Sequence, residues 1–146
     1  MNSQNKCRFT WEDRGVYVVF EGEFTMEQIM QEHERFVGSP AFDELIYTIV
    51  DLTKADLSKI AADDAFSLVA ADVGASMTLP DNIMSVVTVH PDTIQLFQFY
   101  AEQMQSVGAP WRVGIHKTVE DARTWIAEER DKIRLRNLTP KPFKDE

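Results

Sequence analysis

Leu45-Ile46-Tyr47-Thr48-Ile49-Val50 is the stretch of the 146-residue sequence that decides the fold. The stretch is apolar almost throughout, and a charged residue bounds it on each side, Glu44 before it and Asp51 after it. Strands with apolar side chains on both faces are typical of parallel sheets, in which helices cover the two faces. The stretch therefore predicts the central strand of an α/β domain, with Ile49 and Val50 in the core.

The segments around this strand show alternating patterns typical of strands and helices. Strands are expected at residues 7–12 and 16–20, joined by a turn, and at residues 83–89 and 111–115. Helices are expected from Thr25 to Gly38, from about Lys59 to Gly74, from Asp92 to Val107 and onward from Thr118. Alternating strands and helices need crossover connections, so most strand pairs should be parallel.

The expected fold is thus α/β, a mixed and mostly parallel five-stranded sheet flanked by four helices. A single domain is expected over residues 1–146, with an ordered core over about residues 7–135 and a tail over residues 139–146. Core strand positions are expected at Val18, Ile49, Val50, Val86, Val87 and Val113. The second helix is expected to turn Phe66, Val69, Ala70 and Val73 inward, and the last helix Val119, Ala122, Ile126 and Ile133.

The composition argues against several classes of partner. The formal net charge of −9 repels phosphate backbones, so nucleic-acid binding is not expected. The one basic cluster, Lys132, Arg134 and Arg136, is interpreted as complementing the negative end of a helix dipole. No apolar stretch is long enough to insert into a membrane, and the single cysteine, Cys7, cannot form an internal disulfide. A cytoplasmic protein is expected.

Polar residues collect where the strands of a parallel sheet end, which is where such sheets bind ligands. The segment from Asp51 to Ser58 reads as a polar loop, and His90 and His116 follow the next two strands. This rim for a ligand or partner comprises Asp51, Thr53, Asp56, Ser58, His90 and His116.

Two interpretations of the rim compete. Asp51, His90 and His116 are residue types that bind metals or transfer protons. Alternatively, these residues are simply the polar side chains that loops and helix starts collect. The second is preferred because no spacing matches a metal-binding or hydrolase motif. No catalytic residue, metal or cofactor is therefore predicted.

Several segments resemble the STAS superfamily, in its SpoIIAA-like, SEC14-related branch. They are Ile49-Val50-Asp51-Leu52-Thr53, Ala75-Ser76-Met77-Thr78-Leu79-Pro80 and Thr118-Val119-Glu120-Asp121-Ala122-Arg123-Thr124-Trp125-Ile126. The resemblance covers roughly Phe9 to Arg130 and implies a SpoIIAA-like sheet flanked by helices. It also implies a non-enzymatic signalling, regulatory or small-ligand-binding role.

One segment departs from that superfamily. Anti-sigma antagonists carry an Asp-Ser-Ser-Gly-like motif with a phosphorylated serine at the start of the second helix. The corresponding segment here is Asp56-Leu57-Ser58-Lys59-Ile60, in which Ser58 is the only hydroxyl residue and no glycine follows.

The helix expected from Asp92 to Val107 has more apolar surface than one sheet face can cover. One arc contains Ile94, Phe97, Ala101 and Met104, and Leu96, Phe99, Tyr100 and Val107 widen it beyond half of the circumference, counted at about 100° per residue. Either the tail, including Phe143, folds back over this helix, or Leu96, Phe99 and Tyr100 meet a partner, most simply a second copy in a two-fold dimer.

These observations rank three functions. The first is a non-enzymatic regulatory or protein-interaction module of the STAS type, in bacterial signalling. The alternative is a carrier or sensor of a small apolar ligand, held between the helices and the sheet. An enzyme that uses the rim residues comes last.

Overall fold

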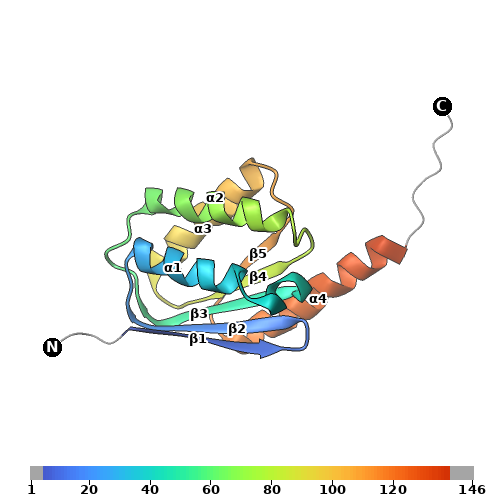
Figure 1. Cartoon of the computed structure of the whole chain (residues 1–146), viewed down its shortest axis with the longest axis horizontal. Helices are drawn as coiled ribbons and strands as arrows, with labels where there is room; N and C mark the ends of the chain where they lie inside the picture. The colour runs from blue at the N-terminus through green and yellow to red at the C-terminus, as the bar shows by residue number, and fades with distance from the viewer. Residues whose placement is uncertain (1–4, 139–146) are drawn as a thin grey trace.

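The five strands of the sheet lie in chain order, β1-β2-β3-β4-β5, in a computed structural model that describes residues 5–138 (Figure 1). Strands β1 (Lys6–Glu12) and β2 (Gly15–Glu23) form an antiparallel hairpin. Strands β3 (Tyr47–Asp56), β4 (Ile83–Val87) and β5 (Arg112–His116) continue the sheet in parallel. The mixed, mostly parallel sheet predicted from the sequence is confirmed.

Helices cover both faces of the sheet, as Figure 1 shows. Helices α1 (Met26–Val37), α2 (Ala65–Ser76) and α3 (Pro91–Ser106) lie on one face, and α4 (Val119–Leu138) lies on the other. Crossovers between parallel strands are right-handed, and each new strand adds to the same side of the sheet, so the three connecting helices share a face. Helix α4 does not connect two strands within residues 5–138, so this rule does not constrain it to the same face.

The central strand is longer than the sequence suggested. The expected loop from Asp51 to Ser58 was wrong, because β3 continues to Asp56 and pairs with the second half of β2. A bulge interrupts this pairing: Val19 lies opposite Asp51, but Glu21 lies opposite Lys54. The bulge explains why polar residues here do not alternate as they do in a regular strand.

The expected core is largely confirmed. Val18, Ile49, Val86 and Val87 are buried, whereas Val50 and Val113 are half-buried. On the far face, Ala122 and Ile126 of α4 are buried against the sheet, and Val119 and Ile133 of the same helix pack at the edge of this second cluster. In the basic cluster of α4, Lys132 pairs with Glu129 and Arg134 with Asp131 within the helix, and Arg136 pairs with Asp81 before β4.

The helix boundaries were partly predicted. Thr25 caps α1 in a capping box with Gln28, as expected. Helix α2 begins at Ala65 rather than near Lys59, after a short 3₁₀ turn at Ala62–Asp64, and it continues past Gly74 to Ser76. Phe66 and Ala70, which were expected to point inward, are exposed, because the buried face of α2 is the one that carries Leu68, Val69 and Asp72.

Candidate functional site

The carboxyl ends of the strands form a shallow hollow that contains part of the predicted rim. Asp56, Ser58 and His90 line it, together with Asp92 and Thr93. The Asp56 carboxylate accepts a hydrogen bond of 2.9 Å from the Ser58 amide. Hydrogen bonds from Ser58 lower the pKa of Asp56. His90 Nε2 lies 2.9 Å from the Thr53 carbonyl oxygen, so the imidazole connects the start of α3 to β3.

Asp51 is not in a loop but within β3, and it is buried on the α4 face of the sheet. Its Oδ2 accepts a 2.6 Å hydrogen bond from the Tyr17 hydroxyl. Its Oδ1 accepts from the Thr53 amide, at 3.0 Å, and from the Thr53 hydroxyl, at 2.7 Å. Burial, and then the bond to Asp51, raise the pKa of Tyr17 to about 12. Asp51 therefore stabilises the bulge of β3 through Oδ1 and bonds to β2 through Oδ2, so both carboxylate oxygens have partners.

His116 lies on the same face but points elsewhere. Its Nδ1 is 2.7 Å from the Ser85 hydroxyl, and its ring is 5.0 Å from the ring of Trp125 on α4. Burial lowers the pKa of His116. In the sheet, Val87 pairs with Asp51 on one side and with His116 on the other, and thus separates the two.

The three residues of the catalytic hypothesis therefore do not converge. Asp51, His90 and His116 each bond to a different partner, and no group of three or more metal-ligating side chains occurs within residues 5–138. In the same part of the chain, no helix has the length and apolar character needed to cross a membrane.

The predicted partner helix was partly wrong. Leu96 and Tyr100 are core residues, with 5% and 0% of their surface exposed. They are buried because α3 packs against both the sheet and α2, which also accounts for its wide apolar arc. The suggested cover by Phe143 lies outside the described residues. Phe99 remains half-buried, and its ring lies 5.3 Å from that of Phe66 on α2, in an edge-to-face contact.

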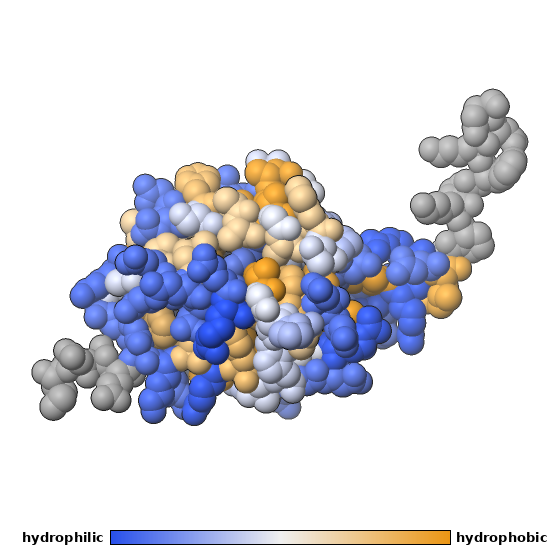
Figure 2. Space-filling view, viewed as in Figure 1, coloured by the Kyte–Doolittle hydropathy of each residue, from blue (hydrophilic) through white to orange (hydrophobic). Residues whose placement is uncertain are grey.

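Phe66 and Phe99 belong to an uncharged surface, which we call the α2–α3 surface. It comprises Phe66, Ala70, Gly74, Met77 and Phe99. Phe66 is 51% exposed and Met77 is 82% exposed. Helix α2 contains one charged residue, Asp72, and that residue is buried. Figure 2 shows apolar residues gathered at the top of the view, over the helices, whereas hydrophilic residues cover much of its lower part.

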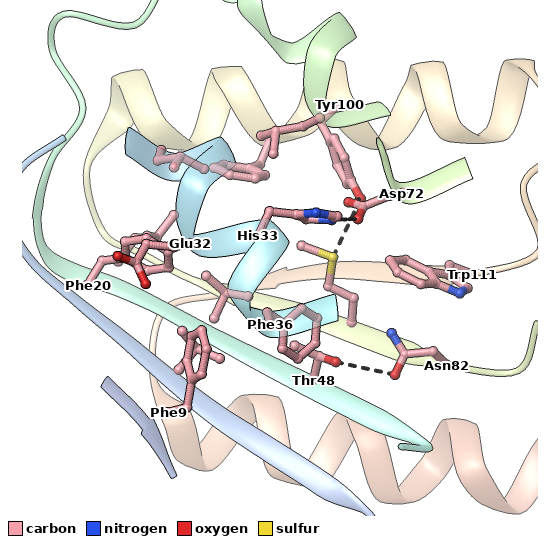
Figure 3. A pocket seen from close by; sticks show the side chains of 17 residues that line it. Phe9, Phe20, Glu32, His33, Phe36, Thr48, Asp72, Asn82, Tyr100 and Trp111 are labelled. Atoms are coloured by element: carbon pink, nitrogen blue, oxygen red, sulfur yellow. Dashed lines mark hydrogen bonds and ion pairs between the residues drawn. The ribbon is translucent and has the colours of Figure 1, made fainter. Parts of the chain in front are cut away.

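A cavity of about 80 Å³ lies on the other side of these helices, between them and the sheet (Figure 3). Its wall is almost entirely apolar and is rich in aromatic rings, which come from both the helices and the strands. These rings are Phe9, Phe20, Phe36, Phe97, Tyr100 and Trp111. Small-molecule sites in proteins are typically concave and apolar, with a few polar groups placed among the rings.

One set of polar groups at the cavity joins the three helices of this face. The Asp72 carboxylate, on α2, lies with Oδ1 2.6 Å from Nε2 of His33, on α1. Its Oδ2 accepts a hydrogen bond from the hydroxyl of Tyr100, on α3. Figure 3 shows the three side chains meeting above the cavity. Burial, and then the Asp72 charge, raise the pKa of Tyr100 well above its usual value.

A second polar group is not fully paired. The amide of Asn82, which is 2% exposed, accepts a 3.3 Å hydrogen bond at Oδ1 from the Thr48 hydroxyl. Its Nδ2 is buried and has no hydrogen-bond partner among residues 5–138. In Figure 3 this nitrogen is turned away from Thr48, toward the interior of the cavity. Buried donors without a partner are rare in folded proteins and call for an explanation.

Sequence reasoning missed most of this site. The contact between His33 on α1 and Asp72 on α2 joins residues 39 positions apart. Asp72 was overlooked, although a single carboxylate in an otherwise uncharged helix is itself a signal of a buried polar network. Asn82 follows Pro80-Asp81, and no sequence pattern marks it as a cavity residue.

No protein-family model matches the sequence, and no curated protein is similar to it. The structure, however, is similar to that of an anti-sigma factor antagonist from Mycobacterium paratuberculosis. The TM-score is 0.56 at 16% sequence identity, over 85% of this chain and 95% of that chain. The chain has the SpoIIAA-like, or STAS, fold.

A further solved structure, an uncharacterised DUF3478-family protein with a SpoIIAA-like fold from Shewanella loihica PV-4, has a TM-score of 0.46. Its sequence identity is 14%, over 86% of this chain and 96% of that chain. The STAS fold assignment rests on the first structure and on the strand order described above. At this level of identity the likeness concerns the fold, so function has to be argued from the surface and the cavity.

Proposed function

We propose that the chain is a non-enzymatic regulatory module of bacterial signalling in the cytoplasm, and that it acts by binding protein through the α2–α3 surface. The observation that carries this proposal is the uncharged, partly apolar outer face of α2 in a chain with a net charge of −9. Interface cores are depleted of charge and enriched in aromatic residues and methionine, as this surface is. The protein from Mycobacterium paratuberculosis with the similar structure is called an anti-sigma factor antagonist, a name that refers to its effect on another protein.

The charge distribution favours a second copy of the chain as the occupant. A basic partner would be attracted to the acidic remainder of the surface rather than to an uncharged face. An acidic partner can bind at the uncharged face of α2 without placing its carboxylates against those of this chain. A second copy of the chain is acidic and can present the same uncharged face. Two-fold symmetry would place Phe66 and Met77 of each copy against the same surface of the other.

Hydrogen–deuterium exchange at low and high micromolar concentration tests where this contact forms. We expect exchange of the backbone amides of α2 to slow severalfold at the higher concentration, because association removes water and suppresses local opening. The amides of α4, on the opposite face of the sheet, serve as the internal control and should exchange equally fast at both concentrations. Exchange in α2 that does not depend on concentration would count against the proposal.

A second candidate function, the carriage or sensing of a small apolar ligand, is favoured by a separate observation. The cavity beneath the three helices combines aromatic walls with a buried unpaired donor, Asn82 Nδ2. The Asp72 network joins the three helices around it, so a ligand there would contact the elements that support the α2–α3 surface.

A further inference from the structure

We infer that the cavity binds a small uncharged molecule with an apolar body and a single hydrogen-bond acceptor, as in a ketone, and that Asn82 recognises the acceptor. This inference deepens the ligand-binding function given above as the second candidate and rests on it. It follows from three properties of the cavity: its unpaired donor, its charges and its volume.

The unpaired donor calls for an acceptor. Asn82 Nδ2 is buried without a partner, while Oδ1 of the same amide is bonded to Thr48. A carbonyl oxygen in the cavity would accept from Nδ2 and recover the hydrogen bond that burial removes. A buried water molecule needs two to four polar partners, whereas the wall around Asn82 is aromatic and aliphatic. An acceptor attached to an apolar body fits this wall better than water does.

The charges at the cavity exclude ionic ligands. Glu32 and Asp72 both line it, so a carboxylate ligand would meet two acidic groups. His33 Nε2 and the Tyr100 hydroxyl are both directed at Asp72 and are not available to a ligand. An ammonium ligand has no lone pair to accept from Asn82 Nδ2. A neutral acceptor is the class that satisfies all of these groups.

The volume limits the size of the body. The cavity, at about 80 Å³, is roughly half the size of an apolar cavity of about 150 Å³ that binds benzene. About four non-hydrogen atoms therefore fit without movement of the helices. Acetone, acetate and 2-methylpropene each have four such atoms in the same planar arrangement. Compared with acetone, 2-methylpropene lacks the acceptor that would face Asn82, and acetate carries a negative charge.

Titration of the whole chain with these three probes, followed by ¹H–¹⁵N NMR, tests the inference. We expect acetone to shift the side-chain amide of Asn82 and the backbone amides of Thr48 and Met84, with about millimolar affinity. Affinity for 2-methylpropene should be about tenfold weaker, because it leaves the donor unpaired. Acetate should not bind.

The paired substitution Thr48→Val with Asn82→Leu removes the amide and its partner while keeping the volume of both side chains. We expect it to weaken acetone binding about tenfold. The urea concentration at the unfolding midpoint of the ligand-free protein should equal or exceed that of the wild type. A merely structural role for Asn82 would lower stability instead. Asn137→Leu, at an exposed position of α4, is the matched control and should change neither property.

The outcomes separate the two claims. If 2-methylpropene binds as tightly as acetone, or acetate binds, recognition by Asn82 is wrong but a small-ligand site remains. If none of the three probes shifts any cavity resonance and the Asn82 amide contacts only water, both the inference and the ligand-binding function are wrong. The comparison of probes uses the wild-type chain, so it holds even where the double variant fails to fold.

Discussion

Replacing Val86 by Asp is expected to abolish folding of the domain. Val86 is fully buried in the middle of β4, and its sheet neighbours on either side are Val50 and Ile115. A carboxylate placed there would have aliphatic groups beside it and no cation to pair with. Burying an unpaired charge costs about 5 kcal/mol or more, against a total stability of about 5–15 kcal/mol for a typical domain.

Far-ultraviolet circular dichroism and urea unfolding measure this effect. Val86→Thr, which keeps the shape and adds one hydroxyl, should remain folded with a loss of about 1–2 kcal/mol. Thr10→Asp introduces the same charge at an exposed position of the edge strand β1 and should change stability by less than about 0.5 kcal/mol. A folded Val86→Asp variant with a cooperative transition near that of the wild type would overturn the assignment of β4 as a buried interior strand of the sheet.

Replacing Asp72 by Ala should give the second-largest effect, a loss of about 3 kcal/mol in the free energy of unfolding. Asp72 is 4% exposed and is the group to which His33 and Tyr100 both bond. Its removal leaves the hydroxyl of Tyr100, which is fully buried, with only the weak acceptor Met84 Sδ at 3.6 Å. It also frees α1, α2 and α3 from their shared polar contact. Breaking a buried hydrogen-bonded pair by removing one member typically costs 3–5 kcal/mol.

Two further variants show whether the effect belongs to the network. Tyr100→Phe removes one hydroxyl and should cost about 1 kcal/mol. Asp131→Ala removes an exposed carboxylate from α4, where it pairs with Arg134, and should cost less than about 0.5 kcal/mol. If urea unfolds Asp72→Ala and Asp131→Ala at the same midpoint, the network does not hold the helices together.

The order of the elements was predictable because it rests on local patterns. The apolar run before Asp51 and the cap at Thr25 both fix structure within a few residues. The end of β3 was not predictable in this way. The polar residues after Asp51 look like a loop in the sequence. They stay in the sheet because they pair with β2 and because the Thr53 amide, in the bulge, donates a hydrogen bond to Asp51.

The candidate site was less predictable, because it depends on contacts between distant segments. The sequence correctly suggested that α3 has more apolar surface than a sheet can cover. It did not reveal that α2 covers the rest of that surface. Leu96 and Tyr100 are therefore core residues, and the exposed aromatic ring is that of Phe66 on α2. The cavity combines residues of β1, β2, α1, β3, α2, β4 and α3, and no local pattern marks such a set.

Sedimentation equilibrium of the wild type, Phe66→Glu and Val89→Glu tests the proposed protein contact most directly. Phe66 and Val89 are about equally exposed, at 51% and 52%, so both substitutions add the same charge at a comparable surface position. Only Phe66 lies on the α2–α3 surface. We predict a dimer at high micromolar concentration for the wild type and for Val89→Glu. For Phe66→Glu we predict association about 100-fold weaker and therefore mostly monomer, because two carboxylates would enter one interface. A wild type that stays monomeric, or a Phe66→Glu variant as dimeric as the wild type, would contradict the account.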